Sequence, residues 1–140
     1  MNIVCVSGGF DPVHVGHVRM IREAAQYGEL IIILNNDNWL LAKKGFVFMP
    51  EEERKEILLA IDGVYQVMIS YHGPCTDDMS VATELRLLHP DIFCNGGDRK
   101  EGCLPTAEER VCKELGIEMR YNVGGEKIQS SSELVSKAKK

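Results

Sequence analysis

NIVCVSGGFDPVHVGH, residues 2–17, contains the pattern of a strand, a tight turn and the start of a helix. Its first six residues are mostly apolar and rich in β-formers, which is typical of a strand covered on both faces in a parallel sheet. Gly8, Gly9 and the Asp-Pro pair that follows indicate a tight turn. His14 and His17 come next, although neither a strand nor a helix needs an imidazole for its own stability. Two histidines at helical spacing therefore indicate a function at this strand-to-helix turn.

The same order of strand and helix continues along the chain. Apolar runs of β-formers predict five strands, at residues 2–7, 30–35, 65–70, 91–95 and 117–123. Helical periodicity and stop signals predict helices between them, which include residues 50–61, 78–88 and 106–115. This alternation predicts an α/β fold, a Rossmann-like doubly wound sheet of five parallel strands, in a single domain over residues 1–140.

The segment before the third predicted strand is read in two parts. Residues 36–49 lack a clear period and predict a mobile loop. The helix over residues 50–61 then begins with Pro50 at its first helical position. It carries three apolar residues on one face, namely Ile57, Leu58 and Ile61.

Composition limits the function. A chain of 140 residues that is 44% hydrophobic fits one buried core. The net charge of -5 and the pI near 5.4 argue against a protein that coats nucleic acid, because phosphate neutralisation needs an excess of Lys and Arg. Five cysteines without a CxxC pair fit a reducing compartment, and the N-terminal run is too short for a signal peptide or a membrane span. We therefore expect a cytoplasmic protein without nucleic-acid or membrane partners.

The first predicted helix offers an anion site. In doubly wound sheets, ligands bind beyond the carboxyl ends of the strands, where strand order reverses. His14 and His17 would lie on the first turn of the helix, beside backbone N–H groups that have no partner within it. Gly16 between them removes a Cβ where a ligand could approach closely. The alternative is that one histidine caps the helix and the other is solvated.

GGFDPVHVGH resembles the HxGH signature of the nucleotidyltransferase superfamily, which includes cytidylyltransferases and small adenylyltransferases. Four further segments resemble heptose-phosphate adenylyltransferases or stand where these enzymes have a motif, namely NNDNWLLAKKG, PEEER, HPDIFCNGGDRK and QSSSEL. The start GGFDPVH is closer to coenzyme A and nicotinamide adenylyltransferases. The Arg-Thr-x-Gly-Ile-Ser-Thr signature of many cytidylyltransferases is absent, and FVFM stands where related enzymes often have Arg-Pro.

The resemblance implies the roles of individual residues. Catalytic roles fall on His14, His17, Lys44 and Arg54. Nucleotide binding falls on Gly8, Gly9, Phe10, Asp11, Gly16, Gly97, Asp98, Ser130, Ser131 and Ser132. Substrate binding falls on Asn35, Asp37 and Lys43. Mg²⁺ is expected with the nucleoside triphosphate, without a metal site on the protein.

Two of these positions also stand out on physical grounds. Arg54 heads the apolar stripe of its helix, where a charge needs an anion unless the side chain snorkels past the edge of the core. Ser130 suffices as a helix cap, so that Ser131 and Ser132 are surplus hydroxyls at a positive helix end.

These observations predict transfer of a nucleotidyl group from ATP or CTP to a phosphorylated small molecule, with pyrophosphate as the leaving group. ATP is slightly preferred, with a sugar or polyol phosphate as acceptor. Three alternatives stay open: a glycerol-3-phosphate cytidylyltransferase, an adenylyltransferase for pantetheine phosphate or nicotinamide mononucleotide, and a non-catalytic nucleotide-binding domain. A homodimer is a further expectation that the sequence leaves open.

Other classes of site fit the sequence less well. No GxGxxG follows the first strand, and no P-loop is present, which argues against a dehydrogenase and a P-loop enzyme. A metal site from His14, His17, His72 and Cys75 lacks standard zinc spacing.

Overall fold

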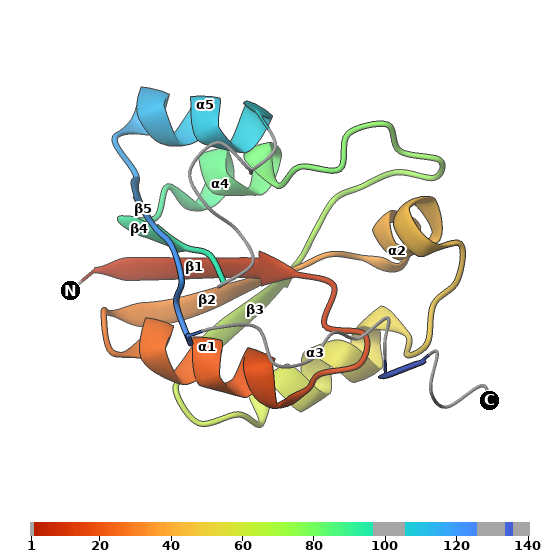
Figure 1. The fold of residues 1–140 in the computed structure, drawn as a ribbon. Coiled ribbons are helices and arrows are strands. Elements are labelled where there is room, and N and C mark those ends of the chain that lie inside the picture. Colours follow the sequence, from red (N-terminus) through yellow and green to blue (C-terminus); the bar gives the residue numbers. More distant parts are fainter. Residues whose placement is uncertain (1, 97–105, 126–133, 136–140) are drawn as a thin grey trace.

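A computed structural model describes residues 2–96, 106–125 and 134–135 of the protein. Five parallel strands form one sheet in the order β3-β2-β1-β4-β5 (Figure 1). The strands are β1 (Ile3–Gly8), β2 (Glu29–Leu34), β3 (Val64–Ile69), β4 (Ile92–Cys94) and β5 (Glu118–Arg120). The predicted five-stranded parallel sheet is therefore confirmed, although β4 and β5 are shorter than predicted.

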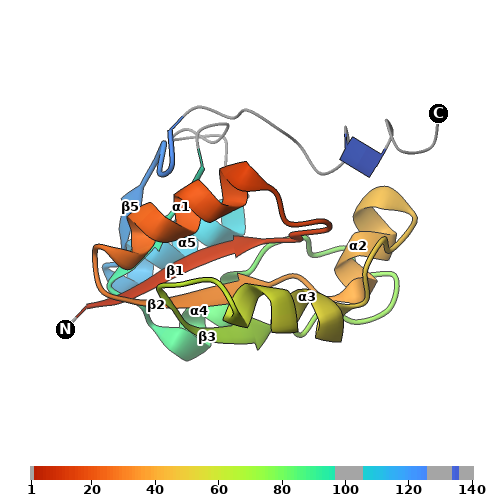
Figure 2. The same cartoon turned by 90° about the horizontal axis from the view of Figure 1, so that it is seen from below.

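Helices cover both faces of the sheet. They are α1 (Val15–Ala25), α2 (Asp37–Lys44), α3 (Glu51–Leu59), α4 (Ala82–Leu88) and α5 (Thr106–Leu115). Helices α1 and α3 lie on one face, and α4 and α5 lie on the other (Figures 1 and 2). The chain runs outward from β1 through β2 to β3 and then returns to β4 on the other side of β1, so strand order reverses between β1 and β4. In folds of this kind the ligand site lies at the carboxyl edge beside that point.

The continuously apolar sequence of β2 is explained by the burial of both faces of this strand. Leu30, Ile32 and Leu34 are buried on the side of α1 and α3, whereas Ile31 and Ile33 are buried on the side of α4 and α5. Because side chains alternate along a strand and both faces are covered, each position needs an apolar residue. No helix of the described residues is both long and apolar enough to cross a lipid bilayer.

The loop predicted over residues 36–49 is wrong for residues 37–44, because these residues form α2. The Asn36 side chain caps the helix, its Oδ1 accepting a hydrogen bond from the Trp39 N–H at 2.9 Å. Gly45 ends the helix with a φ of +82°, a conformation that glycine adopts without steric cost. Trp39 and Leu40 are buried. An asparagine before the segment and a glycine after it were the sequence signals for this helix.

The apolar face predicted for residues 50–61 is wrong in part. Pro50 is the N-cap residue, and the helix begins at Glu51. Ile57 is exposed, whereas the buried residues of α3 are Arg54 and Leu58. A charged residue thus replaces a hydrophobe on the face that meets the rest of the protein.

Helix α4 also starts later than predicted, at Ala82 rather than at residue 78. Asp78 Oδ1 accepts hydrogen bonds from the Ser80 N–H at 2.9 Å and from the Ser80 hydroxyl at 2.6 Å. This local turn gives the backbone an alternative to the first helical turn.

The buried cysteines are protonated thiols. Cys5, Cys94 and Cys112 are free and buried. Burial raises the pKa of Cys5 and of Cys94 to about 12, and it raises the pKa of Cys112 to about 11. These side chains therefore act as small apolar groups of the core.

Gly124 lets the segment after β5 pass directly against α1. Its φ is +87°, and a Cβ would lie 2.7 Å from both the N and the Cα atom of Met20. Gly124→Ala is expected to lower the free energy of unfolding by about 2–5 kcal/mol, because it combines a left-handed alanine with a backbone clash. Denaturant unfolding measures the loss. Gly125→Ala is the control, since Gly125 has a φ of +82° and no atom of the described residues lies within 4 Å of the position of its Cβ. An equal loss in both variants would show that only the conformation matters.

Candidate active site

His14 and His17 cap the first turn of α1 reciprocally. His14 is the N-cap residue, and its Nδ1 accepts a hydrogen bond from the Gly16 N–H at 3.1 Å. His17 Nδ1 accepts one from the His14 N–H at 3.2 Å. The two rings stack with their centroids 3.8 Å apart and their planes 22° apart. The pair thus takes the place of the Ser and Glu of an ordinary capping box.

The caps determine which nitrogen of each ring carries the proton. An imidazole nitrogen that accepts a hydrogen bond carries no proton of its own. Because Nδ1 is the acceptor in both His14 and His17, each neutral ring has its proton on Nε2. No acidic residue occupies the first turn of α1. The positive end of the helix and two N–H donors thus meet at this turn, an arrangement that attracts an anion.

Gly16 and Phe10 hold the two rings in place. A Cβ on Gly16 would lie 3.0 Å from His14 Cε1 and 3.1 Å from its Nδ1, so the room at Gly16 is used by the His14 ring. The Phe10 ring is buried in the core and meets the His17 ring edge-on, with centroids 4.7 Å apart. His17 therefore contacts His14 through one ring contact and Phe10 through another.

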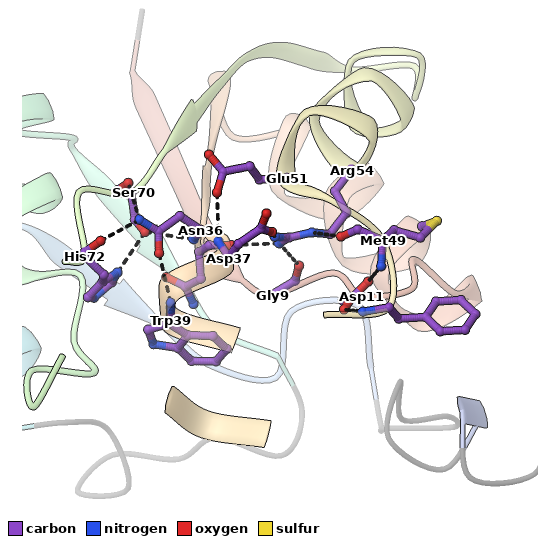
Figure 3. A network of polar contacts seen from close by, with 12 residues as sticks. Gly9, Asp11, Asn36, Asp37, Trp39, Met49, Glu51, Arg54, Ser70 and His72 are labelled. Carbon is purple, nitrogen blue, oxygen red and sulfur yellow. Dashed lines mark hydrogen bonds and ion pairs between the residues drawn. The ribbon is translucent and has the colours of Figure 1, made fainter. Parts of the chain in front are cut away.

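Arg54 lies inside the protein at the carboxyl edge of the sheet (Figure 3). Its side chain is 0% exposed. Nε donates to the Met49 carbonyl at 2.8 Å, and Nη1 donates to the carbonyls of Gly9 and Asn35, both at 2.7 Å. Nη2 donates to Asp37 Oδ1 at 2.6 Å.

Four of the five N–H groups of this guanidinium are therefore used within the protein. The anion expected beside Arg54 is present as Asp37, and the side chain joins the ends of β1 and β2 to α2 and α3. Its predicted contact with a substrate phosphate stays a prediction. The geometry favours a positioning role beneath the site.

Asp11 anchors the segment between α2 and α3. It is 2% exposed, and its two carboxylate oxygens accept hydrogen bonds from the N–H groups of Phe48 at 2.7 Å and Met49 at 2.6 Å. This carboxylate holds the segment against the turn after β1 (Figure 3). Asp11 and Asp37 thus have internal partners, and their predicted contacts with ligand stay predictions.

A second polar cluster, which the sequence did not indicate, ties β2 to the end of β3. The Asn36 amide donates to the carbonyls of Ser70 at 3.1 Å and His72 at 2.8 Å (Figure 3). The buried His72 ring contacts Ser70 Oγ at 2.7 Å through Nδ1 and the Ser80 carbonyl at 2.8 Å through Nε2. His72 therefore serves the packing of loops. The described residues contain no group of three or more His, Cys, Asp or Glu side chains that could hold a metal ion.

Lys43 and Lys44 lie in the last turn of α2, not in a loop. Lys43 Nζ lies 5.4 Å from the centroid of the Trp39 ring. Burial lowers the pKa of Lys44, and the charges of Lys43 and Arg54 lower it further, whereas Asp11 acts in the opposite direction. Burial and the neighbouring positive charges make the protonated form of Lys44 less favourable in the folded protein. An anion bound beside the ammonium group would stabilise this form.

Lys44→Met is expected to raise the Tm of the ligand-free protein at neutral pH, because it removes a partly buried charge. The pKa of Lys44 is lower in the folded protein than in the unfolded chain, so the unfolded chain binds more protons between the two values. Wild-type stability therefore rises as the pH rises through this range, and the gap in Tm to the variant should narrow. Thermal unfolding across an alkaline pH series measures the gap. The exposed Lys43 supplies the control variant, Lys43→Met, for which no gain is expected.

The other predicted site residues divide into two groups. Gly8, Gly9 and Asn35 lie at the carboxyl ends of β1 and β2, and a Cβ on Gly9 would lie 3.0 Å from Leu40 Cδ2 of α2. Five predicted residues lie outside the described part of the chain, namely Gly97, Asp98, Ser130, Ser131 and Ser132. The structure thus brings together the turn after β1, the end of β2 and the last turn of α2.

Known proteins share both the sequence and the fold. Residues 5–132 match the cytidylyltransferase-like family. FAD synthase of Pyrococcus horikoshii is 34% identical over 116 residues, which cover 81% of this chain and 74% of that protein. The bifunctional protein HldE of Geotalea uraniireducens is 33% identical over 116 residues, but these cover only 21% of its length.

A solved structure, that of a lipopolysaccharide core biosynthesis protein from Thermoplasma volcanium, has the same fold with a TM-score of 0.67. It is 24% identical, with 86% of this chain and 93% of that chain covered. The family match spans the β1–α1 turn, where both histidines cap the helix, and it extends over nearly all of the sheet. This chain belongs to the cytidylyltransferase-like family and is a nucleotidyltransferase.

Proposed function

We propose that the enzyme transfers AMP from ATP to the phosphate group of a hydroxylated small molecule and releases pyrophosphate. The observation that carries the proposal is the reciprocal cap of His14 and His17, which directs the ring protons to Nε2 at the positive end of α1. Two neutral N–H donors beside a helix N-terminus suit the oxygens of a phosphate group in transfer.

The reaction needs little covalent chemistry from the protein. An oxygen of the acceptor phosphate attacks the α-phosphorus of ATP in line and forms a P–O bond. The bond between the α-phosphorus and the bridging oxygen breaks, and pyrophosphate leaves with that electron pair. In this proposal, His14 and His17 donate to the oxygens around the α-phosphate, and Lys44 neutralises charge on the β- and γ-phosphates or the acceptor. Ser131 and Ser132 bind the triphosphate tail.

Mg²⁺ is proposed to arrive as the complex with ATP. The described residues offer no cluster of metal ligands, and the Asp11 and Asp37 carboxylates have internal partners. We therefore propose that the ion is held through the nucleotide rather than by these two carboxylates. Phosphate oxygens of the nucleotide are the ligands that Mg²⁺ prefers in such enzymes.

The first acceptor to test is FMN. FAD consists of FMN joined to AMP through two phosphates, so its synthesis is an AMP transfer to the phosphate of a ribityl chain, which is a polyol phosphate. The FAD synthases of Pyrococcus horikoshii and Thermococcus kodakarensis are each 34% identical to this chain. The sugar phosphates suggested by the heptose-phosphate adenylyltransferase motifs are the second choice.

Pyrophosphate release tests the proposal. Each of the four common nucleoside triphosphates, with Mg²⁺, is combined with FMN, a heptose phosphate, glycerol 3-phosphate, nicotinamide mononucleotide or phosphopantetheine. The expected result is release with ATP that depends on a polyol or sugar phosphate, together with the matching adenylylated product by mass. Reactions without acceptor give the background.

Two other results have a clear meaning. Turnover with CTP alone would overturn the choice of donor, and turnover only with nicotinamide mononucleotide or phosphopantetheine would overturn the choice of acceptor. ATP binding without release of pyrophosphate for any acceptor would contradict the transfer reaction itself.

A further inference from the structure

Asn35 carries a buried side-chain oxygen that has no partner in the described part of the chain. The residue directly follows β2 and is 4% exposed. Within the described residues, its Oδ1 has no hydrogen-bond partner. A buried amide oxygen in this state is unfavourable for folding, and in native proteins such an atom usually has a functional explanation or a bound partner.

The neighbouring Asn36 is an example of a side-chain amide at the same edge of the sheet whose hydrogen bonds are made within the protein. Asn36 is also buried, at 7% exposed, but its Oδ1 accepts from the Trp39 N–H and its Nδ2 donates to two carbonyls. Figure 3 shows this amide directed at Ser70 and His72. Two adjacent asparagines with similar burial thus differ at their amide oxygens, since among the described residues the Oδ1 of Asn36 has a donor and that of Asn35 has none.

The backbone of Asn35 is held firmly. Its N–H donates to the Gly8 carbonyl at 2.9 Å, and its own carbonyl accepts from Arg54 Nη1 at 2.7 Å. The same Nη1 also holds the Gly9 carbonyl at 2.7 Å. The backbone of Asn35 is therefore fixed at the carboxyl edge of the sheet, beside the turn that leads to the two histidines.

The chemistry of the atom restricts the group that it can bind. An amide oxygen accepts hydrogen bonds and does not pair with the oxygens of an ionised phosphate, which are acceptors too. The Asn35 Oδ1 atom therefore needs an O–H or N–H donor, and this donor must lie on a part of the ligand other than its phosphate group.

We propose that Asn35 Oδ1 accepts a hydrogen bond from a hydroxyl of the acceptor substrate and so selects acceptors whose carbon chain is hydroxylated. This inference rests on the proposed function. The resemblance implies only that Asn35 binds substrate, and the inference adds which atom of Asn35 is used and which group of the acceptor it binds. Asn35 contacts the substrate but takes no part in bond making, so it determines specificity.

The test compares FMN with an analogue whose phosphate sits on a five-carbon chain without hydroxyls. Wild-type enzyme is expected to prefer FMN by about 10- to 100-fold in kcat/KM, which is the size of the effect when a buried acceptor loses its donor. Asn35→Leu should lose most of this preference, through a lower kcat/KM for FMN. Its Tm without ligand should equal or exceed that of wild type, because an unsatisfied polar atom is gone.

Asn36→Leu is the matched control. It removes three side-chain hydrogen bonds, so its Tm should fall while the preference of the remaining folded enzyme for FMN persists. A lower Tm for Asn35→Leu with an unchanged preference would overturn the inference and point to a bound water or another structural partner instead.

The two proposals fail in different ways. No pyrophosphate release from wild type with any acceptor would contradict the proposed function. Binding of FMN and of its hydroxyl-free analogue, followed by flavin fluorescence, still examines Asn35 in that case. Equal affinity of wild type for the two flavins would overturn the role of Asn35.

Discussion

His17→Gln is expected to lower kcat by roughly 10²- to 10³-fold while the Tm stays close to that of wild type. Glutamine is a usual residue at the third helical position of a capping box, so its side chain can replace His17 Nδ1 as the acceptor for the His14 N–H. The imidazole Nε2–H is lost in this variant. The expected loss is that of one preorganised donor to the charge of the transition state.

His17→Ala separates the two roles of this side chain. It removes both the cap and the imidazole, so it should lose about 0.5–2 kcal/mol of stability in addition to the same loss of kcat. Steady-state kinetics and thermal unfolding of both variants measure the two effects. If His17→Gln keeps the wild-type kcat, the histidine has only a structural role at the start of α1.

Arg54→Met is expected to lower the free energy of unfolding by about 3–5 kcal/mol, because it leaves a carboxylate and three carbonyls without their shared donor. Arg54→Lys should recover only part of this loss, since an ammonium lacks the planar fork that reaches several acceptors at once. Denaturant unfolding measures both variants.

Arg86→Met is the matched control for the loss of an arginine. Arg86 pairs with Glu114 at the surface, where the two side chains are 50% and 47% exposed, so less than about 1 kcal/mol is expected. A stable Arg54→Met variant with a raised KM for ATP or for the acceptor would contradict the positioning role. It would favour the direct phosphate contact that the sequence resemblance implies.

Helix α2 shows where local patterns are informative and where they fall short. Its asparagine cap and its terminal glycine are visible in the sequence, but the segment between them has only a weak apolar period. The helix is stabilised by burial of Trp39 and Leu40, and a Cβ on Gly9 would press against the Leu40 side chain. Because these contacts join residues about thirty positions apart, a reading of nearby residues alone underestimates the helix.

The strands and the histidine turn were determined by the sequence itself. Continuous apolar runs require a sheet that is covered on both faces. Two histidines three positions apart lie on the same turn of a helix, whatever the helix packs against. Such features depend on periodicity over a few residues. The cap that directs both ring protons to Nε2 spans only residues 14–17, so it too is local.

Only the tertiary structure decided which partners the polar side chains find. Arg54 reaches Gly9, 45 positions away, and Asp11 reaches Met49, 38 positions away. An arginine that binds groups of the protein and an arginine that binds a phosphate look the same in sequence. The reason is that a guanidinium pairs equally well with a carboxylate, a carbonyl or a phosphate. The same holds for Asn35 and Asn36, whose amides are chemically identical. Folding brings donors and acceptors to the Asn36 amide, whereas the Asn35 Oδ1 has no partner among the described residues.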